Sequence, residues 1–373
     1  MTPRPHASAA SMKFPPHLSL PLHTNGTLQP GILGNKQLVS HKVHQQIPAT
    51  SQPPLTLSMD PSSEIILDTP FFRIYSDRRI DRLIGTTTVP PGFDAATGVT
   101  SKDVVLDGDI GLYVRLYLPD TASDDNKKLP VLVYFHGGGF VTQSAASPPY
   151  QRFLRGLAAR AGLLVVSVNY RLAPEHPLPA GYEDCLRALK WAVSGDGDPW
   201  LSQHGDLNRV FLAGDSAGGN IVHNVAMMAA SDGEAAGSEA RIEGAVLLHG
   251  GFGGREPIDG ETPEWMAITE KLWGFVCPEA TDGADDPRMN PLVAAAPSLR
   301  SLPCKRVLVC VAEKDSTLPR NRAYYQALAA SGWAGTVEWF ESKGQEHVFF
   351  LVKPHCDEAV ALMDRLVAFF AGN

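Results

Sequence analysis

The serine at position 216 lies in a short pattern that is typical of a catalytic nucleophile. Residues 214–218 read Gly-Asp-Ser-Ala-Gly and match G-x-S-x-G, between an apolar stretch at 210–213 that predicts a strand and residues 219–230 that predict a helix. A tight turn from strand to helix strains the backbone of the nucleophile, and flanking glycines permit the turn because they add no side chains. We therefore predict that Ser216 is an exposed nucleophile. The alternative, a serine that only caps the helix, does not explain the paired glycines.

A second glycine-rich segment follows the predicted strand at 129–135. Residues 136–140 read His-Gly-Gly-Gly-Phe. Acyl transfer needs backbone N–H groups aimed at the oxygen that becomes negative, and a glycine run lets the backbone approach the substrate. We expect Gly138, Gly139 and Ala217 to form this oxyanion hole. A phosphate-binding loop is the alternative, but neither Gly-Lys-Ser/Thr nor GxGxxG follows.

A base and an acid should follow the serine in the order Ser, acid, His. Asp315 comes just after the apolar stretch at 307–311, and His347 follows the stretch at 337–340. Both are predicted to lie on loops at the edge of the sheet where Ser216 lies. We expect His347 to take the proton of Ser216 and return it to the leaving group, while Asp315 orients the imidazole.

Other titratable residues compete for these roles. Glu313 is close enough to replace Asp315 as the acid, but an Asp at a strand end is the commoner choice. His176 precedes the serine, which is the wrong chain order, and has a structural interpretation beside a proline-rich turn. His223 and His249 fall on a predicted helix and a predicted buried strand, where hydrogen-bonded core histidines are usual. No cluster has the spacing of metal ligands, so we expect neither a metal nor another cofactor.

Alternating apolar and amphipathic stretches from about residue 103 predict the elements that position these groups. Repeated strand–helix alternation with continuously apolar strands predicts an α/β fold with a parallel sheet covered on both faces. The predicted strands are 111–118, 129–135, 163–169, 210–213, 245–249, 307–311 and 337–340, and the predicted helices are 151–161, 181–193, 219–230, 322–331 and 357–371.

An insertion of more than fifty residues separates the strands at 245–249 and 307–311. It is too long for a simple connection and is predicted to be a cap over the edge of the sheet where ligands bind. Its Trp265 and Trp273 are candidates to line the substrate pocket together with Phe140 and Asp215. The alternative for the aromatic residues is packing within the cap.

The N-terminus differs in composition from the rest of the chain. The first acidic residue of the 373 is Asp60, and the segment before it is rich in Ser, Thr, Pro, His and Gln. We predict an extension at 1–58, as a transit peptide, a disordered tail or an overextended gene model, and one domain at 59–373. The location is then cytoplasmic, or plastid if the extension is a transit peptide.

Charge and cysteine content restrict the partners and the compartment. A net charge of −8 argues against a nucleic acid or an anionic membrane surface as partner, since both need a basic footprint. No apolar run has the length of a membrane helix. The five dispersed cysteines have no CxxC spacing, and we expect reduced, mostly buried thiols.

From residue 59 onward the chain resembles the plant carboxylesterases of the hormone-sensitive-lipase-like α/β-hydrolase family. The matching segments are 136–139, 169–177 (NYRLAPEHP), 214–220, Asp286-Pro287 with Asn290-Pro291, and His347. The resemblance implies an eight-stranded, mostly parallel sheet with a cap from about 60–100 and 252–303. It also implies cofactor-free hydrolysis of small carboxylic esters through an acyl-enzyme, by a monomer or homodimer.

The same family contains other activities, which remain as alternatives. Tuliposide-converting enzymes keep a serine triad but transfer the acyl group within the substrate to form a lactone, and some carry plastid-type extensions. Gibberellin receptors replace the catalytic histidine, whereas this chain has His347. Hydroxyisoflavanone dehydratases use threonine as the nucleophile, whereas this chain has Ser216.

Overall fold

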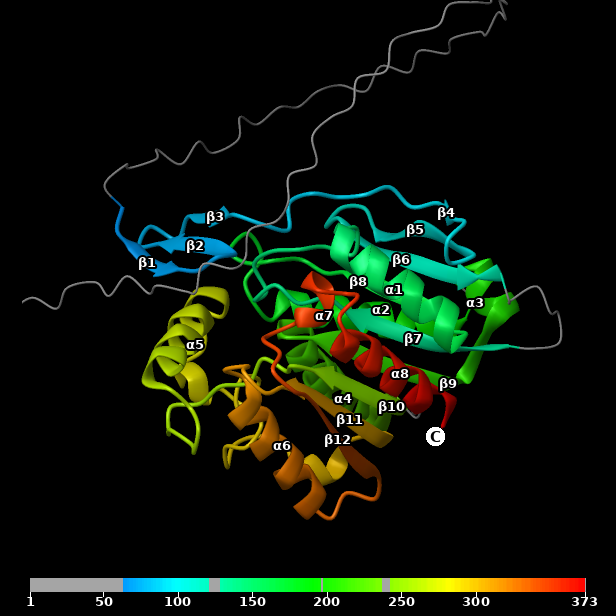
Figure 1. The fold of residues 1–373 in the computed structure, drawn as a ribbon. Coiled ribbons are helices and arrows are strands. Elements are labelled where there is room, and N and C mark those ends of the chain that lie inside the picture. The colour runs from blue at the N-terminus through cyan, green and yellow to red at the C-terminus, as the bar shows by residue number, and fades with distance from the viewer. Residues whose placement is uncertain (1–62, 121–127, 196, 237–241, 373) are drawn as a thin grey trace, which may run out of the picture. The chain divides into compact units, whose positions relative to one another are not determined.

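The structure, a computed structural model, describes residues 63–120, 128–195, 197–236 and 242–372 (Figure 1). The predicted extension at 1–58 lies outside these residues. Within them, no helix is long and apolar enough to cross a membrane. All five cysteines are unpaired, and all except Cys356 are buried, as predicted.

The main sheet has nine strands among the described residues, in the order β12-β11-β10-β9-β7-β8-β6-β5-β4. Neighbours from β8 to β12 pair in parallel, whereas β4 with β5, β5 with β6 and β6 with β8 pair antiparallel, so the expected mostly parallel sheet is confirmed. The two-residue β4 adds a ninth strand to the eight that the resemblance implies. The strands are β4 Phe93–Asp94, β5 Val99–Asp107, β6 Leu112–Pro119, β7 Leu129–Phe135, β8 Leu164–Asn169, β9 Gly205–Asp215, β10 Ile242–Leu248, β11 Cys304–Ala312 and β12 Thr336–Ser342.

Helices cover both faces of this sheet. The helices are α1 Pro148–Ala161, α2 Ala180–Ser194, α3 Pro199–His204, α4 Ala217–Ala236, α5 Pro263–Val276, α6 Leu318–Ala330, α7 Phe349–Val352 and α8 Asp357–Ala371. Side chains of α2, α4 and α6 belong to one buried apolar cluster, and those of α1, α7 and α8 belong to the other. The two clusters explain why the central strands are apolar at every position rather than at every second one.

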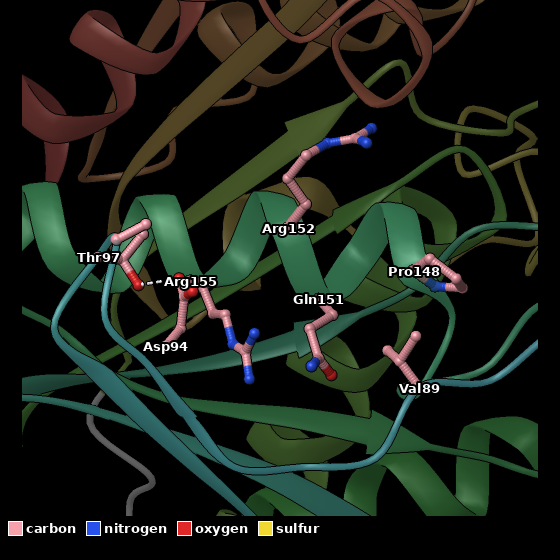
Figure 2. Close-up of a pocket in the computed structure, with 8 residues that line it drawn as sticks. Val89, Asp94, Thr97, Pro148, Gln151, Arg152 and Arg155 are labelled. Carbon is pink, nitrogen blue, oxygen red and sulfur yellow. Dashed lines mark hydrogen bonds between the residues drawn. The ribbon is translucent and has the colours of Figure 1, made fainter. Parts of the chain in front are cut away.

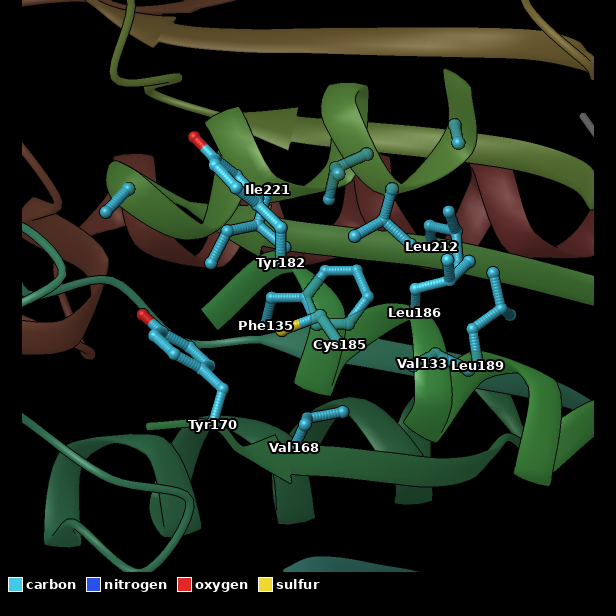
Figure 3. Packing of buried hydrophobic residues seen from close by; sticks show 14 of the residues in the cluster. Val133, Phe135, Val168, Tyr170, Tyr182, Cys185, Leu186, Leu189, Leu212 and Ile221 are labelled. Atoms are coloured by element: carbon cyan, nitrogen blue, oxygen red, sulfur yellow. The ribbon is translucent and has the colours of Figure 1, made fainter. Parts of the chain in front are cut away.

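Strand β7 shows how one sequence serves both clusters. All seven of its residues are buried. Val133 and Phe135 belong to the cluster with α2 and α4, and Figure 3 shows Val133 near Leu189 and Phe135 near Cys185 of α2. Tyr134, on the opposite face, belongs to the cluster with α1 and α8. Successive side chains of a strand point to opposite faces, so a continuous apolar run fills both.

The insertion and the first described residues pack together. A three-stranded antiparallel sheet consists of β1 Ile65–Asp68, β2 Phe72–Tyr75 and β3 Ile80–Arg82. Its β1 contacts α5 of the insertion, and the Arg78 guanidinium donates a hydrogen bond of 2.9 Å to the carbonyl of Phe275 in α5. Helix α5 begins after Thr262, whose hydroxyl accepts from the N–H of Trp265.

Candidate active site

Ser216 lies in the turn between β9 and α4 with a left-handed backbone, at φ +53°. Its N–H donates to the carbonyl of Leu248 at 2.9 Å, and its own carbonyl accepts from the N–H of Gly251 at 2.8 Å. A Cβ on Gly218 would overlap the carbonyl oxygen of Phe135, so the helix can start this close to β7 only with glycine there. The turn thus has the strained geometry that the G-x-S-x-G pattern predicts.

The structure brings the predicted base and acid to this serine. The Oγ atom of Ser216 lies 2.9 Å from Nε2 of His347, and Nδ1 of His347 lies 2.8 Å from Oδ2 of Asp315. The backbone N–H of Thr317 donates to Oδ1 of Asp315 at 2.8 Å. The three side chains follow β9, β11 and β12, so one edge of the sheet assembles residues that are 131 positions apart in sequence.

The surroundings keep these groups in the charge states that base catalysis needs. Burial alone would raise the pKa of Asp315, but the adjacent His347 and the hydrogen bonds from two histidines outweigh it and hold that pKa well below its usual range. Burial likewise works to lower the pKa of His347, but the charge of Asp315 and its hydrogen bond prevail and raise it above 6.5. Asp315 is thus an anion that stabilises an imidazolium at His347.

The rival residues lie elsewhere. Glu313 is exposed, accepts a hydrogen bond from the N–H of Gly344 at 2.7 Å and pairs with Lys343. His176 is exposed, and His223 is buried on α4, where Nδ1 lies 3.1 Å from the hydroxyl of Tyr324.

The glycine-rich loop after β7 carries two of the predicted oxyanion donors, and its Gly139 lines the same cavity as Ser216. Gly138 has φ +107°, and a Cβ there would overlap the carbonyl oxygen of Thr142. Among the described residues, no hydrogen bond engages the N–H of Gly138 or Gly139. Ala217 is the first residue of α4, where an N–H has no intrahelical acceptor. The three predicted oxyanion donors are therefore available to a ligand.

Asp215 has a different position from the one predicted. The residue is 1% exposed, and its carboxylate accepts hydrogen bonds from the hydroxyls of Tyr134 at 2.8 Å and Tyr150 at 2.9 Å and from the N–H of Gly137 at 3.1 Å. Burial raises its pKa to about 6, and these donors moderate the rise. Both oxygens are occupied, so the geometry does not support a contact with substrate; Asp215 instead ties the glycine-rich loop to the serine turn.

A cavity of about 60 Å³ opens beside Ser216 and Ala217. The other predicted pocket residues, Phe140, Trp265 and Trp273, all line it. Most of the remaining lining is apolar and comes from α5 and the adjacent loops: Gly139, Gly251, Phe252, Ile268, Thr269, Leu272, Val276, Met289 and Thr317. Helix α5 therefore covers the serine with an apolar wall, as a cap should.

A larger groove of about 390 Å³ lies between α1 and the chain before β5 (Figure 2). Its lining includes Arg152 and Arg155 of α1 together with Asp94 and Thr97, which are hydrogen-bonded to each other. Among the residues that the structure describes, its lining contains no serine, cysteine or histidine. The groove has the larger volume, but the serine that lies beside a histidine lines the smaller cavity.

Sequence reasoning missed the contact of His249 with Asp315. The interpretation as a core histidine is correct for its burial, since it is 0% exposed, but Nδ1 lies 2.6 Å from Oδ2 of Asp315. Its place directly after β10, at the edge where the other strands end, was the available signal. Nitrogen and oxygen atoms of His249, Asp315 and His347 lie within 4.8 Å of one another, the one such cluster in the described part of the chain. A metal ion there would compete with the hydrogen bonds by which Asp315 holds the Nδ1 atoms of the two histidines.

Comparisons with known proteins agree with this geometry. A profile of the α/β-hydrolase fold matches residues 132–351. Tuliposide A-converting enzyme 1 of Tulipa gesneriana, a chloroplastic protein, is 44% identical over 362 residues, which cover 93% of this chain and 91% of that enzyme. Probable carboxylesterase 13 of Arabidopsis thaliana is 42% identical over 326 residues, covering 83% of this chain and 99% of that protein.

Solved structures extend the similarity to esterases of other organisms. An esterase of Pyrobaculum calidifontis matches with a TM-score of 0.60 at 28% identity, over 73% of this chain and 84% of that one. The family profile alone spans more than half of the chain, and the plant relatives span most of it. The chain therefore belongs to the plant carboxylesterase family of α/β-hydrolases.

Proposed function

We propose that the chain cleaves a small carboxylic ester through an acyl group carried on Ser216. The observation that carries this proposal is the continuous hydrogen-bonded series from Ser216 through His347 to Asp315, at 2.9 and 2.8 Å, beside unengaged backbone donors. A hormone-binding protein without turnover has no use for a base at hydrogen-bond distance from the serine.

In this proposal, each group has a step. His347 Nε2 accepts the hydroxyl proton as Ser216 Oγ attacks the ester carbonyl, and the N–H groups of Gly138, Gly139 and Ala217 stabilise the resulting oxyanion. The intermediate collapses when His347 gives its proton to the departing alcohol. An acyl-Ser216 ester remains, and a second nucleophile must remove it.

That second nucleophile is, in our proposal, a hydroxyl of the acyl group itself, so that the product is a lactone. Relatives that share 44% of the sequence are named for converting tuliposide A. The cavity beside Ser216 is small and walled by aromatic and aliphatic side chains, so it disfavours water and leaves a hydroxyl on the acyl chain as the nearest nucleophile. His347 would accept its proton and return it to Ser216.

Hydrolysis by water is the second candidate, favoured by the similarity to carboxylesterase 13. Two matched substrates separate the candidates: the glucose 6-ester of 4-hydroxybutanoic acid, which can close to a five-membered lactone, and that of butanoic acid, which cannot. Reaction of the full chain in ¹⁸O-water, sampled early, should give unlabelled lactone from the first ester and little turnover of the second. Free acid labelled with ¹⁸O from both esters would show hydrolysis instead.

The Ser216→Ala and His347→Ala variants test the proposal itself. Both should lose turnover of both esters by at least about 10³-fold while remaining folded. Turnover by the folded Ser216→Ala variant at the wild-type rate would refute the acyl-serine route.

A plastid location is proposed from the composition of the first 58 residues and from the chloroplastic relative. Fusion of residues 1–58 to a fluorescent protein should direct it into plastids of a plant cell. A fusion that stays in the cytosol would refute this part of the proposal.

A further inference from the structure

Two histidines share one oxygen of Asp315. Nδ1 of His249 lies 2.6 Å from Oδ2, and Nδ1 of His347 lies 2.8 Å from the same atom. The rings meet edge to face, with centroids 5.7 Å apart. The established roles of a serine, a base and an acid do not require a second imidazole, so its presence needs a physical explanation.

The surroundings of His249 fix its tautomer and its charge. Asp315 is an anion, so the short contact requires a proton on Nδ1 of His249. The N–H of Val348 also faces this Nδ1, but at 3.4 Å it does not compete. Nε2 is buried without a partner, and the rings of Phe349 and Phe350 lie about the imidazole, so nothing stabilises a second proton. Burial lowers the pKa of His249 despite Asp315, and the side chain stays neutral.

The backbone of His249 is held in an unusual conformation to make this contact. Its φ is +55°, in the left-handed region that residues other than glycine, asparagine and aspartate rarely enter. Its N–H donates to the carbonyl of Cys310 in β11 at 2.8 Å, which anchors the turn beside the strand that leads to Asp315. Such strain persists where the surroundings impose it and is concentrated at functional sites.

We infer that His249 is a positioning residue that fixes Asp315 and limits how strongly this carboxylate attracts the proton of His347. The inference rests on the proposed function. Thr317 N–H holds Oδ1 and His249 holds Oδ2, so the carboxylate cannot rotate away from His347. Because part of the charge on Oδ2 is satisfied by a neutral donor, His347 is a weaker base than Asp315 alone would make it, and its imidazolium releases a proton to the leaving group more readily.

The pH dependence of kcat/KM tests this role. The charged group that acts on both imidazoles is Asp315, from the loop after β11, and Asp215, at the end of β9, also acts on His347. The His249→Leu variant fills the volume but removes the donor, so the pKa of His347 should rise and the acidic limb of kcat/KM should move up by roughly half a pH unit or more. Its plateau should fall on the order of ten-fold. His249→Asn, which keeps a donor and tolerates positive φ, should restore the wild-type limb.

His223→Leu is the matched control, because it removes a buried histidine of the same domain that has no polar contact with Asp315. Its acidic limb should stay at the wild-type pH. An unshifted limb in an active His249→Leu variant would overturn the inference, as would equal shifts in the Leu and Asn variants.

A measurement on the wild-type chain covers the case in which His249→Leu does not fold. Protein labelled with ¹⁵N-histidine should show two strongly hydrogen-bonded Nδ1–H protons at low field, and His249 should remain a neutral Nδ1–H tautomer between pH 5 and 8. Finding its proton on Nε2 would overturn the inference. Loss of all turnover in the wild type would instead refute the proposed function and leave this spectroscopic test intact.

Discussion

Replacing Asp215 tests whether a buried carboxylate beside the serine acts through the glycine-rich loop or through the substrate. In the structure its oxygens receive the hydroxyl protons of Tyr134 and Tyr150 and the N–H of Gly137. Gly137 immediately precedes the proposed oxyanion donors. The Asp215 carboxylate therefore connects the turn that carries the proposed nucleophile to the loop that carries the proposed oxyanion donors.

The expected loss of stability follows from the number of hydrogen-bond donors that each variant leaves without an acceptor. Asp215→Ala leaves the hydroxyls of Tyr134 and Tyr150 without this acceptor in a fully buried site, whereas the N–H of Gly137 still donates to the Tyr150 hydroxyl at 2.9 Å. Each orphaned hydroxyl costs about 1 to 3 kcal/mol, so the free energy of unfolding should fall by roughly 2 to 5 kcal/mol. Displacement of the loop should lower kcat about 10²-fold or more, as the loss of an oxyanion donor does. Asp215→Asn keeps one accepting oxygen and should cost about 1 kcal/mol and less than ten-fold in kcat.

Urea unfolding measures the change in stability. Steady-state kinetics, at a temperature where all variants are folded, measure the change in kcat. The control is Asp184→Ala, which removes the buried α2 carboxylate that pairs with Arg171, and it should lower stability without lowering kcat. If Asp215→Ala raised KM and left kcat unchanged, the residue would contact substrate. The claim that it acts by holding the glycine-rich loop would then be refuted. Equal losses for the Ala and Asn variants would also refute it, since the argument counts orphaned donors.

Three further predictions use the same site. Gly138→Ala should lower kcat by about 10²-fold or more, because a Cβ would overlap the carbonyl of Thr142; a near wild-type rate in an esterase assay would contradict this. The kcat/KM profile should fall in acid with a midpoint above 6.5, because Asp315 raises the pKa of His347 and the protonated ring cannot act as base; a midpoint below 6.5 would contradict it. Because the pKa of Asp215 is raised to about 6 in the folded state, its protonated form stabilises the fold fully below about pH 4, and this contribution is lost as pH rises through about 6. The difference in unfolding free energy between wild type and Asp215→Asn should therefore change between these two pH values, and a constant difference would contradict the prediction.

The sequence predicts the central elements well because their signals are physical requirements. Strand β7 must be apolar at every position to serve two clusters, and its predicted bounds, 129–135, coincide with the observed ones. Helix α8 at 357–371 likewise has the predicted bounds. The order of serine, acid and histidine can be read because each follows an apolar strand, and parallel strands bring their carboxyl ends to one edge.

Other elements carry no such signal. Strand β5 alternates buried and partly exposed residues and carries Lys102 and Asp103, so its pattern resembles a polar edge rather than a core strand. Strand β9 is predicted only at 210–213, because its first half contains Asp206 and Asn208, although the strand begins at Gly205. These segments become strands through pairing with neighbours, which a local pattern does not encode.

The position of Asp215 differs from the prediction for another reason. Its place next to the nucleophile suggests substrate contact, but side chains alternate along the end of β9, so Asp215 points to the face of Tyr134 and Tyr150. Period-two reasoning applied to β9 would have placed Asp215 on the opposite face from Leu212 and Gly214.

Backbone strain marks the edge of the sheet where we propose that the reaction takes place. Six residues other than glycine have a positive φ among those the structure describes, and four of them adjoin the proposed machinery: Phe140 after the oxyanion loop, Ser216, His249 and Val348 after the base. Each follows a different strand of the sheet, β7, β9, β10 or β12. A residue with positive φ after a strand turns the backbone sharply. The side chain there therefore stays at the edge of the sheet instead of projecting past it. Phenylalanine and valine are poorly suited to positive φ, at a cost on the order of 1 kcal/mol each, so only tertiary packing can hold them there. The catalytic geometry therefore depends on the two cores beneath the edge as much as on the reacting residues.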